Sequence, residues 1–187
     1  MAEDVSKRAY ALGFEYERDK GNCAQCVFAA VQEVLGERND DIFKAANGFA
    51  GGSGRMGTGN CGAYSGGILV ISSKFGRSRQ EFNERKSRQQ QTNEVVEFNG
   101  KQIPKGFSLR DVLVRELHDK FVEEYGSVIC NDIRQKLFGR TFDEWNPTDK
   151  EEFEKAGAHH VPPYHCPTVV GKAAQWTTEI LLKAEKF

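Results

Sequence analysis

The sequence predicts an all-α fold: a single-domain bundle of several helices over residues 1–187, with a glycine-rich loop and a polar insertion. Apolar residues recur at three- and four-residue spacing through most of the chain, which is typical of helices that bury one face. Capping residues, glycines and prolines separate these segments, and there is no internal repeat or clear sheet pattern. A chain of 187 residues can also bury a core without covalent braces.

Three helices are expected before the glycine-rich loop. Residues 4–19 place apolar side chains among charges at helical spacing. Asn22 can cap a second helix over 23–35, because its side chain can accept a hydrogen bond from a free backbone N–H group. A third, shorter helix over 40–49 begins at one of two aspartates.

The glycine-rich segment 48–59 cannot hold a stable helix and is predicted to be a loop or a tight turn. A helix rich in small residues follows, beginning at Cys61 or Gly62. The polar insertion at about 77–106 is expected to be an exposed helix or an irregular excursion, with a short strand at 94–98. The remaining helices are expected over 108–125, 130–138, 148–156 and 168–185. Pro167 suits the first position of the last of these, after a proline-containing loop.

Composition excludes several classes of protein. The chain has 26 basic and 27 acidic residues and a formal net charge of -1, so we expect no attraction to nucleic acid or to anionic membranes. The longest apolar run, 66–72, is too short to cross a bilayer, and the charged N-terminus does not resemble a signal peptide. We therefore expect a cytoplasmic protein without membrane insertion. Structural disulfides are rare in the cytoplasm, so the five cysteines of this chain favour metal binding or redox chemistry.

Three cysteines lie at two expected helix starts, where free N–H groups and the helix dipole favour a thiolate. Cys61 directly follows the glycine-rich loop, and Cys23 and Cys26 form a CxxC pair at the start of the second helix. The alternative is that these are small core residues, because free cysteine is often simply buried. For the CxxC pair, this alternative means that one thiol points into the core and the other has no chemical role.

The other two cysteine positions lie in the C-terminal half. Cys166 stands at the mouth of the last helix, in a loop that also holds His159 and His160. His165, the preceding residue, could complete a zinc or iron site beside Cys166, or could simply be a solvated loop histidine. Taken alone, Cys130 is more typical of a core residue than of a ligand.

The glycine-rich loop has a second interpretation. Its backbone amides could cradle a phosphate at the start of the following helix, with Arg55 as a charged partner. However, the loop lacks the Gly-Lys-Ser/Thr ending of a P-loop, and no βαβ unit surrounds it. Backbone amides and thiolates that close around a metal cluster explain the same glycines, and for that cofactor we expect contacts from Gly59, Gly62 and Ser65.

Taken together, NCAQ at 22–25, GFAGG at 48–52, CGAYSG at 61–66, Cys130 and CPTVV at 166–170 resemble the C_GCAxxG_C_C family of redox-active proteins. The resemblance runs from about residue 5 to 183. It implies a mostly helical protein whose four characteristic cysteines are Cys23, Cys61, Cys130 and Cys166. The chain departs from the family pattern at Asn60, which stands where the motif has glycine, and in its additional thiol, Cys26.

Three functions remain open from the sequence. In the first, the four family cysteines, with Cys26 and His165 as further ligands, bind an iron–sulfur cluster or zinc and transfer electrons to an unidentified redox partner. In the second, no cofactor is bound, and the chain is a dithiol oxidoreductase in which the thiolate of Cys61 or Cys23 attacks. Cys26, Cys130 or Cys166 then acts as the resolving thiol. In the third, the chain is a helical interaction protein with structural zinc or incidental cysteines. A homodimer is expected if the small-residue face at 63–67 is exposed.

Overall fold

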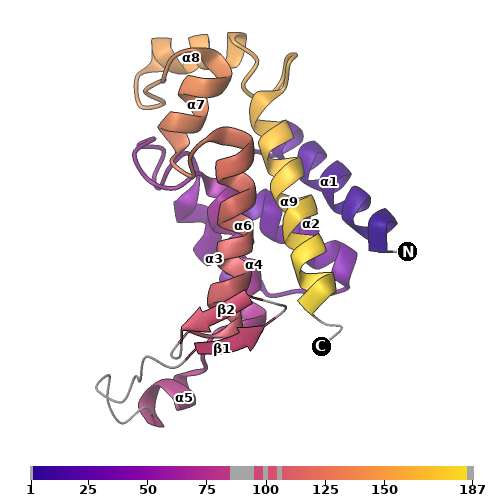
Figure 1. The fold of residues 1–187 in the computed structure, drawn as a ribbon. Helices are drawn as coiled ribbons and strands as arrows, with labels where there is room; N and C mark the ends of the chain where they lie inside the picture. The colour runs from indigo at the N-terminus through magenta and orange to yellow at the C-terminus, as the bar shows by residue number, and fades with distance from the viewer. Residues whose placement is uncertain (1, 85–94, 99–100, 105–106, 185–187) are drawn as a thin grey trace.

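The computed structural model describes residues 2–84, 95–98, 101–104 and 107–184, most of which are helical. Five long helices form a bundle in which α9 lies against α1 and α6, while α2 packs between α1 and α4 (Figure 1). These helices are α1 (Ala2–Asp19), α2 (Cys23–Leu35), α4 (Gly62–Phe75), α6 (Leu109–Tyr125) and α9 (His165–Ala184). The all-α class predicted from the sequence is confirmed for the part of the chain that the structure describes.

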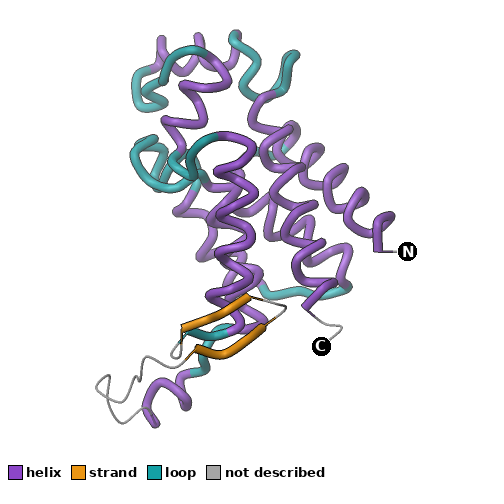
Figure 2. Tube along the Cα trace, in the orientation of Figure 1, coloured by secondary structure: helices purple, strands orange, loops and turns teal. Residues whose placement is uncertain are grey.

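Shorter elements lie at the two ends of this bundle. Helices α7 (Cys130–Phe138) and α8 (Pro147–Lys155) form one end, while a small hairpin and α5 (Arg79–Glu84) form the other (Figure 2). Helix α3 (Asp40–Ala46) and the 3-10 turn η1 (Asn47–Phe49) lead into the glycine-rich loop. The end formed by α7 and α8 is the end that carries the candidate site.

The polar insertion is only partly described. Within the predicted 77–106 segment, the structure gives α5 and an antiparallel hairpin of β1 (Val95–Phe98) and β2 (Lys101–Pro104). The strand expected at 94–98 therefore corresponds to β1. Residues 85–94, 99–100 and 105–106 lie outside the described residues, and so does any expectation for them.

Most helix ends fall where the sequence predicts them, because the capping chemistry is local. The Asn22 side chain accepts a hydrogen bond of 3.3 Å from the N–H of Gln25 and starts α2. One expectation was wrong: the last helix begins at His165, three residues before the predicted start. The Thr168 N–H donates to the Tyr164 carbonyl, 3.0 Å away, so the helical turn already includes Pro167. A proline is tolerated there because N–H groups of the first turn have no helical partner.

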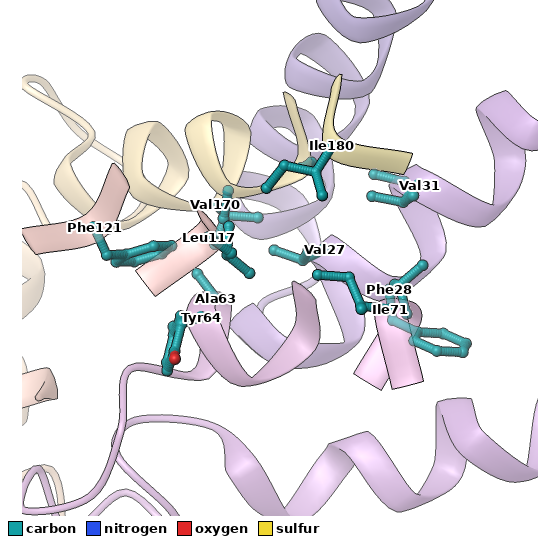
Figure 3. Packing of buried hydrophobic residues seen from close by; sticks show 14 of the residues in the cluster. Val27, Phe28, Val31, Ala63, Tyr64, Ile71, Leu117, Phe121, Val170 and Ile180 are labelled. Atoms are coloured by element: carbon teal, nitrogen blue, oxygen red, sulfur yellow. The ribbon is translucent and has the colours of Figure 1, made fainter. Parts of the chain in front are cut away.

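The main core lies between α2, α4, α6 and α9 and is closed by aromatic and branched side chains (Figure 3). The Phe121 ring is buried, and its centroid lies 5.3 Å from that of Tyr64 and 5.5 Å from that of Trp176. Glycines let α1 and α9 approach closely: a Cβ built on Gly13 would lie 3.1 Å from the Cβ of Ala174. Such apolar burial is the main favourable term in folding this bundle.

A second, smaller apolar cluster joins α7 and α8 to the start of α9. Phe142, Phe153 and Ala158 are its buried members, and Phe138 and Cys166 pack against it. This cluster places the first turn of α9 beside α7, and therefore brings Cys166 toward Cys130.

The small-residue face of α4 is buried inside the protein. Residues 63–67 are all buried, and a Cβ on Gly66 would lie 2.5 Å from the Ala24 carbonyl oxygen. The condition on which a homodimer was expected, exposure of this face, is therefore not met. Among the described helices, none combines the length and the apolar character needed to cross a membrane.

Candidate functional site: a cavity lined by four thiols

A cavity of about 350 Å³ lies at the end of the bundle where α7 and α8 stand. Its wall includes four cysteines from four separate segments of the chain. They are Cys23, Cys61, Cys130 and Cys166. All four are free thiols, so the structure brings together the four positions that the sequence singled out.

Cys23 enters the cavity wall from the first residue of α2. Gly62 allows it to sit there, because a Cβ on Gly62 would lie only 2.2 Å from the Cys23 sulfur. Burial raises the pKa of Cys23 well above the usual thiol value, and the nearby Gly51 N–H lowers it by a smaller amount. In the metal-free protein this thiol is therefore protonated at neutral pH.

Cys61 stands at the cap position of α4, as the sequence predicted. Burial raises its pKa to about 11, although the N–H groups of Ala63 and Tyr64 at the helix start act in the opposite direction. The helix start therefore makes Cys61 more acidic than burial alone would, but not acidic enough to be a thiolate at neutral pH.

A short β-bridge connects the segments that carry Cys61 and Cys130. Asn60 pairs with Ile129, and the Cys61 N–H donates to the Val128 carbonyl over 2.7 Å. In the other direction, the Cys130 N–H donates to the Gly59 carbonyl over 3.0 Å. These bonds fix the two cysteines side by side, although 69 positions separate them in the sequence. Burial raises the pKa of Cys130, and the Cys61 sulfur adds to the effect.

Cys166 lies in the first turn of α9, and its N–H donates to the Ala158 carbonyl over 3.0 Å. A charge on Cys166 would raise the pKa values of Cys61 and Cys130. The three sulfurs are therefore within electrostatic reach of one another around the cavity.

Cys26 and His165, the two other candidate ligands, do not line the cavity. The Cys26 thiol donates to the Gly21 carbonyl over 3.0 Å, and burial raises its pKa. His165 packs against the ring of Phe138, with 4.4 Å between the centroids. Both side chains therefore have structural contacts at the positions where they stand.

Gly59, Gly62 and Ser65 also stand behind the cavity wall rather than on it. The Gly59 N–H is used within the loop, donating to the Gly52 carbonyl over 3.1 Å, and the Ser65 N–H is used within the α4 turn, donating to the Cys61 carbonyl over 3.0 Å. Their contribution in this structure is to shape the loop and the helix start that carry Cys61.

The sequence did not reveal that a half-buried histidine stands between two carboxylates in the same cavity. His159 Nδ1 donates to Glu154 over 2.7 Å, and His159 Nε2 lies 3.5 Å from Glu17. Burial lowers the pKa of His159, but hydrogen bonds with Cys166, Glu154 and Glu17 outweigh it and raise the pKa to about 12. The ring is therefore an imidazolium at neutral pH. Only the tertiary fold reveals Glu17, which reads in the sequence as one more charged residue of an amphipathic helix.

The sequence also did not reveal an ion-pair network in the cavity wall. The Arg134 guanidinium pairs with Glu144, which also pairs with Arg55 of the glycine-rich loop, 2.6 Å away. Arg134 stands four residues after Cys130 on α7, so helical spacing could have indicated that the two share a face.

The donor set suits a soft metal or an iron–sulfur cluster, because thiolates are preferred ligands of both. Within the described ranges, no three Cys, His, Asp or Glu side chains converge closely enough to hold one metal ion. The four thiols share the wall of one cavity.

The fold and the site place this chain among helical proteins with cysteines from separate segments gathered at one cavity. The chain belongs to the C_GCAxxG_C_C family, whose model carries the description "Putative redox-active protein (C_GCAxxG_C_C)" and matches residues 21–180. That range includes all four cavity cysteines. No curated protein and no solved structure gave a significant match to the sequence.

Proposed function

We propose that the four cavity cysteines bind an iron–sulfur cluster and that the protein transfers electrons through it. The observation that carries this proposal is the meeting of Cys23, Cys61, Cys130 and Cys166 on one cavity. Four thiols that serve only as core residues would be expected to pack against other side chains and not to share the wall of a cavity, since protein interiors are normally close-packed.

The acidity of these thiols supports a metal-bound role. Burial raises the pKa values of Cys23, Cys61 and Cys130, so without a metal they are weak nucleophiles at neutral pH. A bound metal reverses this, because coordination deprotonates a thiol outright. When bound, an iron–sulfur cluster supplies a reversible one-electron couple, and the four thiolates would hold it.

The arrangement of the described side chains supports a cluster over zinc. In a tetrahedral zinc site with Zn–S bonds of about 2.3 Å, the sulfurs are about 3.8 Å apart. The described side chains do not converge in this way on any single-ion site. A cluster holds its four cysteine ligands further apart and fits the cavity without such convergence.

Anaerobic purification followed by a visible spectrum and iron, sulfide and zinc analysis tests this proposal. We expect broad brown absorbance with iron and acid-labile sulfide, and we expect Cys61→Ser to abolish both. Cys26→Ser is the matched control, because its thiol does not line the cavity. Stoichiometric zinc without iron would replace the cluster with a structural zinc site and remove the electron-transfer role.

A metal-free dithiol oxidoreductase is the second candidate, and one feature of the cavity favours it. His159, an imidazolium, lines the same cavity as Cys166, and cysteine nucleophiles are commonly paired with a charged histidine. The Cys166 thiolate would attack a substrate disulfide and release one substrate thiolate. Cys61 or Cys130 would then displace the second, which leaves an internal disulfide and a reduced substrate. Purified protein without metal, whose thiols titrate to one disulfide at a defined potential, would support this function and contradict the cluster.

A further inference from the structure

Arg134 is a permanently charged side chain buried in the wall of the cysteine cavity. It stands on α7, four residues after Cys130, and both residues line the cavity. Its side chain is only 5% exposed. A guanidinium keeps its charge at every physiological pH, so this position places a fixed positive charge beside the thiols.

The surrounding contacts hold Arg134 in place but leave one donor unused. Nη1 donates to the Phe142 carbonyl over 3.2 Å, Nη2 pairs with Glu144, and the guanidinium carbon lies 4.5 Å from the centre of the Phe153 ring. The Nε atom is buried and has no hydrogen-bond partner. A buried donor without a partner is costly, and a group bound in the cavity could accept from it.

The local charge balance points to an anionic partner. Glu144 is a single carboxylate, 4% exposed, shared between Arg134 and Arg55. Two cations thus share one anion at this part of the wall. A buried charge that is incompletely neutralised destabilises the protein. A negative charge on Cys130 or Cys166 would interact favourably with Arg134, and both sulfurs lie on the same cavity.

We propose that Arg134 is the positioning residue that stabilises negative charge on the thiolate-ligated centre and so raises its reduction potential. This inference rests on the proposed function. Reduction adds one electron to the centre, supplied in the experiment by dithionite, and no bond or proton changes at Arg134. The fixed guanidinium charge favours the more negative, reduced form over the oxidised form.

The test is an anaerobic potentiometric titration, followed by visible absorbance, of the loaded protein and its variants. We expect Arg134→Gln to lower the equilibrium constant for one-electron reduction at least tenfold, a shift of about 59 mV to more negative potential. Arg140→Gln is the matched control. It removes the same charge from the next segment, where the Arg140 side chain is 52% exposed and paired with Asp149 and Glu152. The equilibrium constant for reduction of this variant should stay within twofold of the parent value.

Glu144→Gln tests the sign of the effect on the reduction potential. It also replaces Arg134→Gln as the test variant if Arg134→Gln does not fold. Removing the shared carboxylate leaves the positive charge of Arg134 less neutralised, so the potential should rise. An unchanged or lower potential in Glu144→Gln, or a parent-like potential in Arg134→Gln, would overturn the inference while leaving the cluster proposal intact.

Alkylation of Cys130 in the metal-free, reduced protein provides a readout that does not depend on cluster assembly. The charge of Arg134 acts to lower the pKa of Cys130, so at pH 9 we expect iodoacetamide to modify Cys130 several-fold more slowly in Arg134→Gln than in Arg140→Gln. Equal rates at Cys130 would count against the inference. A parent protein that takes up no iron and sulfide would instead refute the proposed function, and the inference with it.

Discussion

At the scale of single residues, the five cysteines divide by environment rather than by type. Cys23 and Cys26 are three positions apart on one helix, yet only Cys23 lines the cavity. The Cys26 thiol is used in a hydrogen bond to the Gly21 carbonyl. The CxxC spacing therefore does not by itself define a pair of ligands here.

Substitutions at these two cysteines should have opposite consequences. Cys23→Ser is expected to abolish iron binding, because it removes one of four cavity thiolates, with a small effect on stability. Cys26→Ala is expected to retain iron but to lower the free energy of unfolding by about 1 kcal/mol, through loss of the buried hydrogen bond. Elemental analysis and urea unfolding measure both effects. Loss of iron from Cys26→Ala at unchanged stability would make Cys26 a ligand.

The acidity of Cys61 predicts the pH dependence of alkylation in the metal-free, reduced protein. Its pKa is raised to about 11, so the thiolate is the minor form throughout the neutral range. The iodoacetamide rate at Cys61 should therefore rise about tenfold per pH unit from pH 7 to 10. Peptide mapping by mass spectrometry measures this rate, with a small free thiol as the control. A rate at Cys61 that levels off below pH 9 would show that the thiol is not buried as described.

At the scale of elements, the site depends on the short bridge and the glycine-rich loop that join its segments. The bridge between Asn60 and Ile129 sets the start of α4 beside the start of α7. Gly62 then permits α2 to approach α4, because its missing side chain leaves room for the Cys23 sulfur. Glycine is needed here for close approach and not only for loop conformation.

Gly62→Ala is therefore expected to destabilise the protein and to impair the site. The added Cβ would lie 2.2 Å from the Cys23 sulfur and 2.9 Å from the Phe49 carbonyl oxygen. Overpacking of this kind costs about 1–3 kcal/mol and displaces a cavity thiol. Gly48→Ala is the control, since nothing lies within 4 Å of its added Cβ. Urea unfolding and iron content should separate the two variants, and equal values would refute the role of Gly62.

At the scale of the whole molecule, two apolar clusters support different parts of the protein. The larger one holds the long helices together, and the smaller one, around Phe153, attaches α7 and α8 to the start of α9. Two of the cavity cysteines, Cys130 and Cys166, belong to α7 and α9, which the smaller cluster joins. Its shape therefore depends on a part of the fold with less buried apolar surface.

Phe153→Ala should loosen this end of the molecule more than the rest. The ring is buried and contacts Phe138 and Phe142, at centroid distances of 5.2 and 4.9 Å. Its removal is expected to cost about 3–5 kcal/mol locally. Hydrogen exchange should accelerate in α7 and α8 while α2 and α4 stay protected. Uniform acceleration over all helices would show that the two clusters unfold as one unit.

The sequence by itself determined the helices, most of their ends and the four cysteines of the family motif. These features depend on local chemistry: apolar spacing, the cap at Asn22 and the glycines that end helices act within a few residues. The predicted start of the last helix was wrong because a proline is tolerated anywhere in the first turn. Pro167 therefore indicates that a helix begins nearby but does not identify its first residue.

Only the tertiary structure decided which residues meet at the cavity. It separates Cys26 and His165 from the cavity wall, and it brings Glu17, His159 and Arg134 to that wall. The physical reason is that burial and charge pairing are properties of the packed molecule. The sequence around Arg134 would be the same whether this side chain were buried or solvated. Packing alone determines that it lines the cavity with the thiols.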